Sequence, residues 1–221
     1  MFNERKAAQM AAFFLGQLLD RKMPHLKLMK LLYLSDREAV RAFGWPISGD
    51  RLVSMPHGPV LSQTLNLMDG DVESQPGGWE EWISDKENHE LSLRQPLDAT
   101  ALDELAPAEI DVLKAVWDKF GAMGKWEIRD WTHQHCAEWK DPKGSSFPIQ
   151  YDALARAVGF DDASAKELAA PIQAEQEIDR IFAALGVCFF RSSGRRYSSR
   201  LGRKVIRIES TFSSCSRIRC R

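Results

Sequence analysis

Apolar residues recur every three or four positions along most of the chain, which is the pattern of amphipathic helices. The first such segment covers residues 3–20, and Asn3 can cap its start. A second predicted helix begins at Pro24, where the missing N–H of proline has no helical partner to lose. It runs to about Phe43, and Gly44 can supply the left-handed conformation that ends it.

The pattern then changes to alternation, which indicates a small amount of sheet. Residues 51–55 (RLVSM) alternate as a strand does. Pro56 and Pro59 are expected to stop any hydrogen-bonded ladder beyond it. A short helix is predicted over residues 60–68, and the segment 79–93 suggests a hairpin that bends at "DKEN".

Helical spacing returns in the second half of the chain. It predicts helices over residues 106–121, 125–139, 149–160 and 164–186, and Pro171 is expected to kink or split the last of them. The predicted fold class is therefore mainly α, of the α+β type, with a helical domain and a small antiparallel sheet or hairpin.

Composition places the protein among ordinary globular chains. It has 221 residues and 44 % hydrophobic residues, which suits one domain with a tail or two small domains. No apolar run approaches the ~20 residues that cross a bilayer, and the N-terminus has no signal-peptide core. The four cysteines form no CxxC pair, so free thiols in a reducing compartment are the simplest interpretation. We expect a cytoplasmic protein that does not enter a membrane.

The net charge of −1 is unevenly spread. Residues 191–221 hold ten basic residues and one acidic residue, so this tail carries +9 and the preceding body −10. A segment of that charge would attract phosphates. Nucleic-acid binding through the tail is therefore an alternative function, while a disordered or adventitious tail explains the same residues equally well.

The second predicted helix carries a basic strip. Lys27, Lys30, Leu34, Arg37 and Arg41 fall within roughly 80° of one another on a helical wheel. The rest of this helix is apolar, so it should be largely buried, with the strip reaching water or a partner. Such a strip would contribute steering and register more than affinity.

Three further residues near the strip are of the kinds that anchor interfaces. Tyr33, Trp45 and Met55 are equally good core residues, and the sequence leaves both roles open. His57 lies between two prolines and suits a loop-ordering or partner-contacting role. The predicted partner-binding residues are Lys27, Lys30, Tyr33, Arg37, Arg41, Trp45 and His57.

Catalysis and metal binding are the competing interpretations of the histidines. His57 could serve a hydrolase as general base, but no nucleophile motif accompanies it, so we predict no catalytic residue. His133 and His135 lie ~200° apart on a helix and cannot share a metal, and Cys136 adds no complete ligand set. Thr132 and His133 are expected to hydrogen-bond within the fold while Trp131 and Trp139 pack. We expect neither a metal nor a cofactor.

The remaining acidic residues also have structural interpretations. Asp36 is expected to be a salt-bridged or hydrogen-bonded carboxylate, since burial would demand a partner. Glu80, Glu81, Glu87 and Glu90 are most simply a solvated acidic edge.

Three motifs in a fixed order resemble a known family. The segment "LKLMKLLYLSDREAVRAFGWPISGDRLVSMPHGPV" resembles the opening of the Panacea domain of SocA-like antitoxins. The later "WTHQHCAEW" is similar to the threonine–histidine and Glu-Trp region of that family, and "IDRIFA" resembles its usual end. The resemblance covers about residues 4–185, which divides the chain into a domain over 1–186 and a basic Ser/Arg-rich tail over 187–221.

The resemblance implies a protein-binding function without catalytic residues. Family members are antitoxins against unrelated toxins commonly encoded beside them. SocA-like members also act as adaptors that present the toxin to an AAA+ protease such as ClpXP. The expected partners are thus a cognate protein toxin and such a protease.

Overall fold

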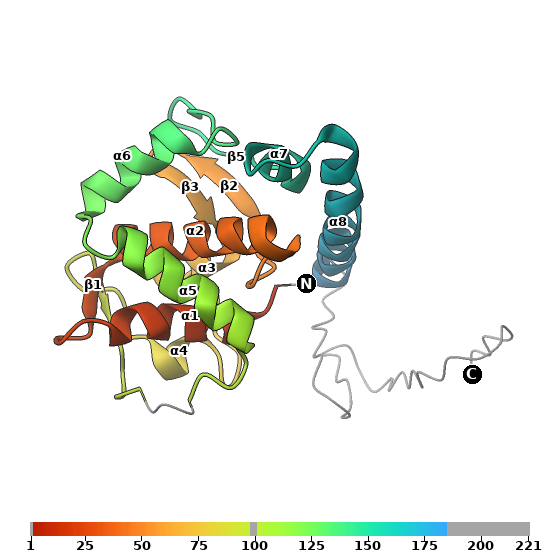
Figure 1. The fold of residues 1–221 in the computed structure, drawn as a ribbon. Helices are drawn as coiled ribbons and strands as arrows, with labels where there is room; N and C mark the ends of the chain where they lie inside the picture. The colour runs from red at the N-terminus through yellow and green to blue at the C-terminus, as the bar shows by residue number, and fades with distance from the viewer. Residues whose placement is uncertain (1, 98–100, 185–221) are drawn as a thin grey trace, which may run out of the picture. The chain divides into compact units, whose positions relative to one another are not determined.

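Helix α2 (His25–Phe43) lies at the centre of the first of two units of the chain. The computed structural model describes residues 2–97 and 101–184, and the chain divides into two units at Gln176, inside the last helix. Within the first unit α2 contacts α1 (Glu4–Gly16), α5 (Pro107–Phe120), α6 (Lys125–His135) and the small sheet (Figure 1). A helix with apolar residues on nearly all sides is buried in this way.

Helix α1 begins and packs as its sequence predicts. The Asn3 side chain accepts a hydrogen bond from the Lys6 backbone N–H at 3.0 Å, which caps the helix. Four buried alanines, Ala7, Ala8, Ala11 and Ala12, bring neighbouring elements close to α1. At the end of α2, Gly44 adopts the left-handed conformation expected of a C-terminal cap.

The three-stranded antiparallel sheet has the order β3-β2-β5. Strand β2 (Leu52–Met55) pairs with β3 (Gly58–Leu61) and, over two residues, with β5 (Phe147–Pro148). The expectation that the prolines prevent a ladder is wrong, because Pro59 lies opposite Ser54 within β3. An edge strand tolerates proline because one side of it needs no donor.

The predicted hairpin over residues 79–93 is only partly present. Residues Trp79–Trp82 form a single helical turn, α4, and Ile83 bridges Leu93. Strand β4 (Glu90–Ser92) pairs instead with β1 (Lys22–Pro24), which the sequence pattern did not predict. The bend between helices α1 and α2 is therefore also a strand.

The remaining helices are α3 (Ser62–Asp69), α7 (Tyr151–Ala157) and α8 (Asp162–Ala184). Pro171 does not split α8, which continues through it as one helix. Pro171 is exposed, so water can satisfy the carbonyl group that loses its helical donor. Ala165, Ala169 and Ile172 are buried on one face of α8. The described residues thus form eight helices and two small antiparallel sheets, which confirms the mainly α fold class.

Candidate functional site: the motif centre and the surface it holds

The three sequence motifs meet in one place, which we call the motif centre. Residues 30–33 (KLLY) lie in the middle of α2, residues 58–60 (GPV) begin β3, and residues 132–139 span the end of α6 and the loop after it. Helix α2 contacts both β3 and α6, and β3 contacts α6. Segments more than a hundred residues apart in the sequence therefore meet in a single cluster.

Lys30 lies at the centre of this cluster and is completely buried. Its Nζ donates to the carbonyl oxygen of Pro59 at 2.7 Å, which ties the hairpin to α2. Burial lowers the pKa of Lys30 to about 7; Cys136 opposes this shift and Arg129 adds to it. An amine with this pKa is uncharged in a large fraction of the molecules at physiological pH, which reduces the cost of its burial.

Gly58 is required where β3 passes close to this amine. Its φ of +92° lies in the region that side chains avoid. A Cβ atom there would lie 2.8 Å from Thr132 Oγ1 and 3.0 Å from Lys30 Nζ. The glycine of the GPV motif therefore serves both a backbone conformation and a close contact.

The histidine and tryptophan of the third motif stack on each other and hold the β2–β3 hairpin. The His133 and Trp139 rings stack with centroids 4.0 Å apart, and Trp139 Nε1 donates to the Met55 carbonyl at 3.1 Å. Thr132 Oγ1 donates to the Arg129 carbonyl, as expected of a residue that bonds within the fold. His133 Nε2 is buried without a hydrogen-bond partner among the described residues, and burial lowers the pKa of His133, with Lys30 adding to the shift.

A second buried bridge joins α2 to the loop after α6. Glu138 Oε1 accepts hydrogen bonds from Tyr33 Oη at 2.6 Å and from Arg37 Nε at 2.8 Å. Burial raises the pKa of the Tyr33 hydroxyl, with Glu138 adding to the effect, so this tyrosine stays a neutral donor. The bridge is a structural tie between two elements.

Most basic side chains of the α2 strip therefore bind neighbouring elements of the same protein. Lys27 Nζ donates to the Gly121 carbonyl at the C-terminus of α5 at 2.7 Å and lies over the Trp117 ring. The expectation that the strip reaches the surface is wrong for Lys30, and Tyr33 beside it is also fully buried. A helical wheel identifies a shared face but not the carbonyl and carboxylate acceptors that neighbouring elements bring to it.

Three predicted partner-binding residues lie at the surface. Arg41 is exposed and forms an ion pair with Glu38 on its own helix. Trp45 is 38 % exposed in the loop after α2, and His57 is exposed at the tip of the β2–β3 hairpin. Their role in partner binding stays a prediction.

The loop after α2 is held by a carboxylate, as predicted for Asp36. Asp36 is buried and accepts from the backbone N–H groups of Ile47 and Ser48, both at 2.9 Å, and from the Ser48 hydroxyl. Burial raises the pKa of Asp36 to about 7 although these donors oppose the shift. Asp50 has an equivalent role, because it accepts from the backbone N–H groups of Gln63 and Thr64 at the start of α3.

Beside the hairpin tip, an exposed tryptophan lies among partly exposed basic side chains. The His57 and Trp126 rings lie 6.1 Å apart, edge to face. Trp126 is 51 % exposed, and its ring is flanked by Arg129 Cζ at 4.8 Å and Lys125 Nζ at 5.5 Å. We call His57, Lys125, Trp126 and Arg129 the tip surface. Such a tryptophan, held by cations, is the kind of side chain that anchors protein interfaces.

The motif centre has little chemistry to offer a substrate. Burial raises the pKa of the Cys136 thiol to about 12, so it is not a thiolate at neutral pH. Across residues 2–97 and 101–184 there is no group of three His, Cys, Asp or Glu side chains able to hold a metal ion. None of the helices in this part of the chain is long and apolar enough to span a membrane.

The sequence interpretation missed Glu138, Trp126 and Asp50. The first could have been suspected, because a buried Tyr33 and a basic residue one turn later require an acceptor. Trp126 carries no such signal, since exposure depends on which face of α6 meets the core. Asp50 follows a turn glycine and precedes a strand, and only the fold brings it to α3.

The comparisons with known proteins agree with this geometry. The family model described as antitoxin SocA-like, Panacea domain, matches residues 28–140, which is just over half of the chain. The chain belongs to this family. The matched region runs from α2 to the loop after α6 and so contains the whole motif centre and the tip surface. No match was found among curated proteins or among solved structures. Membership of an antitoxin family is consistent with a role that needs no catalysis.

Proposed function

We propose that this Panacea-domain protein is an antitoxin that binds a cognate protein toxin and neutralises it. Membership of the SocA-like antitoxin family carries this proposal. The arrangement of the motifs supports it, because Lys30, Gly58 and Glu138 serve packing and bridging instead of forming an open reaction site. A protein that works by presenting a rigid shape needs such an interior.

The tip surface is our candidate for the contact with the toxin. Trp126 is exposed although it is large and apolar, and it lies beside a hairpin tip that Lys30 and Trp139 hold from two sides. A pre-organised surface loses little conformational entropy on binding. We propose that Trp126 is the main anchor and that His57, Lys125 and Arg129 set the orientation of the partner.

Co-expression with the neighbouring gene tests the function. The neighbour expressed alone should stop growth, and this chain should restore growth and co-purify with the neighbouring protein. A neighbour that is harmless alone, with no protein retained on this chain, would contradict the antitoxin role.

Single substitutions then test the surface. Trp126→Ala should weaken toxin binding about 100-fold and His57→Ala about 5-fold, within the range of measured interface anchors. Leu19→Ala is the matched control, because Leu19 is a fully exposed apolar residue that belongs to neither the motif centre nor the tip surface. If Trp126→Ala binds the toxin unchanged while Arg41→Ala or Trp45→Ala binds it more weakly, the toxin contacts the end of α2 instead of the tip surface.

We also propose that the complex is delivered to an AAA+ protease such as ClpXP, as the family resemblance implies. The toxin should then be degraded faster in cells that contain this chain than in cells without it. The difference should disappear when the ClpX gene is deleted. A toxin half-life that is independent of ClpX would leave neutralisation by binding alone.

The alternative function is nucleic-acid binding through the basic segment 191–221, which lies outside the described residues. The charge of +9 favours it. Binding should then weaken steeply between 50 and 200 mM salt, since each neutralised phosphate releases a counterion. Salt-independent binding, or none at 50 mM salt, would remove this alternative.

A further inference from the structure

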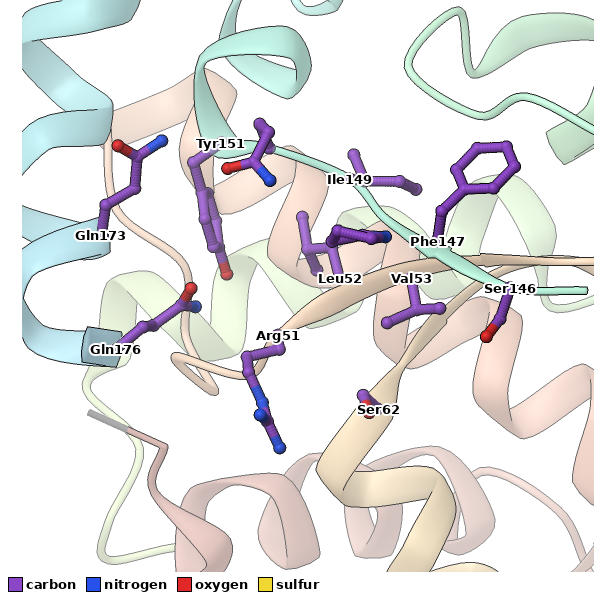
Figure 2. Close-up of a pocket in the computed structure, with 12 residues that line it drawn as sticks. Arg51, Leu52, Val53, Ser62, Ser146, Phe147, Ile149, Tyr151, Gln173 and Gln176 are labelled. Carbon is purple, nitrogen blue, oxygen red and sulfur yellow. The ribbon is translucent and has the colours of Figure 1, made fainter. Parts of the chain in front are cut away.

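A small pocket lies beside the two-residue strand β5, and none of its lining residues belongs to the motif centre. It has a volume of about 280 Å³. Its walls come from four regions of the first unit, which are strand β2 with the residue before it, the first residue of α3, the segment 146–151, and the middle of α8. Figure 2 shows Gln173 and Gln176 on one side of the pocket and Phe147 on the other. This volume suits one amino-acid side chain more than a cofactor, which generally needs a larger cavity.

The lining divides into an apolar part and a polar part. Val53 and Phe147 supply apolar surface, and Phe147 is 38 % exposed although it belongs to a strand. Ser62, Gln173 and Gln176 supply hydroxyl and amide groups. An apolar surface with a few convergent polar groups is the common composition of a binding pocket.

Arg51 gives the pocket its charge. It is exposed, and its guanidinium has no ion pair or hydrogen bond with any residue of the described chain. The neighbouring carboxylate of Asp50 does not compete for it, because that carboxylate is buried and accepts from Gln63 N, Thr64 N and Thr64 Oγ1. A guanidinium presents a planar fork of donors that matches a carboxylate.

The far wall of the pocket is fixed in place. Tyr151 Oη donates to the Asp50 carbonyl at 2.8 Å, and Gln176 Nε2 donates to the same carbonyl at 3.2 Å. The Ile149 backbone N–H donates to the Leu52 carbonyl at 2.8 Å, which extends the pairing beyond β5. The pocket therefore exists before any ligand arrives, which lowers the entropic cost of binding.

We propose that this pocket binds an extended peptide segment of a protein partner that bears a carboxylate. The carboxylate pairs with Arg51, and the apolar side chain next to it lies on Val53 and Phe147. This inference goes beyond the proposed function, because it assigns a peptide ligand to a site outside the motif centre and outside the matched residues 28–140 for most of its lining.

Three short peptides test the proposal with the full chain and without any toxin. Acetyl-Val-Phe has a terminal carboxylate, acetyl-Phe-Glu-amide has a side-chain carboxylate, and acetyl-Phe-Gln-amide is neutral. Amide chemical-shift changes at Phe147 and at the Gln173 and Gln176 side chains report binding. At least one acidic peptide should bind about tenfold more tightly than the neutral one, and the preferred acid shows whether a chain end or a side chain is recognised.

Two variants make the result specific. Arg51→Gln should bind all three peptides equally. Arg21→Gln, at an exposed arginine that is not part of the pocket lining, should behave as the wild type. Phe147→Ala should weaken all three peptides together. Equal binding of acidic and neutral peptides to the wild type, or no shift changes up to 20 mM peptide, would overturn the proposal and leave the antitoxin function untouched.

Discussion

Lys30 and Gly58 show how a motif of modest length can depend on a single contact. The Lys30 amine reaches the Pro59 carbonyl because strand β3 passes close to it at Gly58. A Cβ atom at position 58 would lie 3.0 Å from the amine nitrogen, so only glycine permits this approach. The lysine in turn tolerates burial because its pKa falls to about 7. Each residue therefore depends on the other for its place in the fold.

Substitution of Gly58 tests this dependence. Gly58→Ala should lower the free energy of unfolding by about 2–4 kcal/mol, because a positive φ and a clash with Thr132 act together. Gly70→Ala is the matched control, since Gly70 has φ +75° with nothing within 4 Å of a new Cβ. It should cost about 1–2 kcal/mol. Urea denaturation of the two variants measures the difference, and equal losses would show that the close contact carries no energy.

The buried amine also predicts a dependence of stability on pH. The pKa of Lys30 is about 7 in the folded chain and 10.5 in its unperturbed state, so the unfolded chain binds more protons between these values. The contribution of Lys30 to stability therefore increases as pH rises from 7 to 10.5, by at most about 1.4 kcal/mol per pH unit. Below pH 7 the full cost of burying the charge is present.

Lys30→Met isolates this contribution, because methionine has similar length and no titrating group. The unfolding free energy of the wild type minus that of the variant should grow between pH 7 and pH 9.5. Urea denaturation at both values gives this difference. Parallel pH profiles for the two proteins would mean that Lys30 keeps its ordinary pKa in the folded chain.

At the scale of elements, α2 shows what its residue pattern could predict. Its bounds, its C-terminal Gly44 and its burial follow from spacing and capping alone. The orientation of its basic face did not follow, because Lys27 meets the end of α5 and Arg37 meets Glu138 only in the folded chain. Local patterns predicted the helices. They did not predict strand β1, because its partner β4 lies about seventy residues away.

Two arginines of α2, each paired with a glutamate, allow a direct comparison of burial. The Arg37 and Glu138 side chains are 15 % and 0 % exposed, whereas those of Arg41 and Glu38 are 56 % and 28 % exposed. Glu138→Ala should cost about 3 kcal/mol, because it leaves Arg37 Nε and the Tyr33 hydroxyl without their acceptor. Glu38→Ala should cost less than about 1 kcal/mol. Thermal and urea unfolding of both variants would show a comparable loss if burial had no influence.

At the scale of the whole molecule, the candidate site was predicted only in part. The order of the KLLY, GPV and Thr-His motifs was sufficient to indicate the family, and family membership is confirmed. The sequence could not separate motif residues that hold the fold, such as Lys30, from those that face solvent, such as His57. Exposure of the tip surface depends on how α6 lies against the hairpin, and no local pattern encodes that relation.

The contrast between the acidic body and the basic segment 191–221 leads to a prediction about the whole chain. The core residues of the described body lie between Ala8 and Ile172, and the described chain ends at Ala184. A chain that ends after Ala184 should therefore keep the unfolding midpoint of the full chain and its affinity for the toxin. Any retention on DNA at 50 mM salt should be lost, because this truncation removes all ten basic residues of the segment 191–221. Calorimetry with the toxin and a DNA-binding titration, run on both proteins, measure the two properties separately. A fall in toxin affinity would place the tail in the interface. DNA binding by the shortened chain would assign that activity to the acidic body, although its negative charge disfavours contact with phosphates.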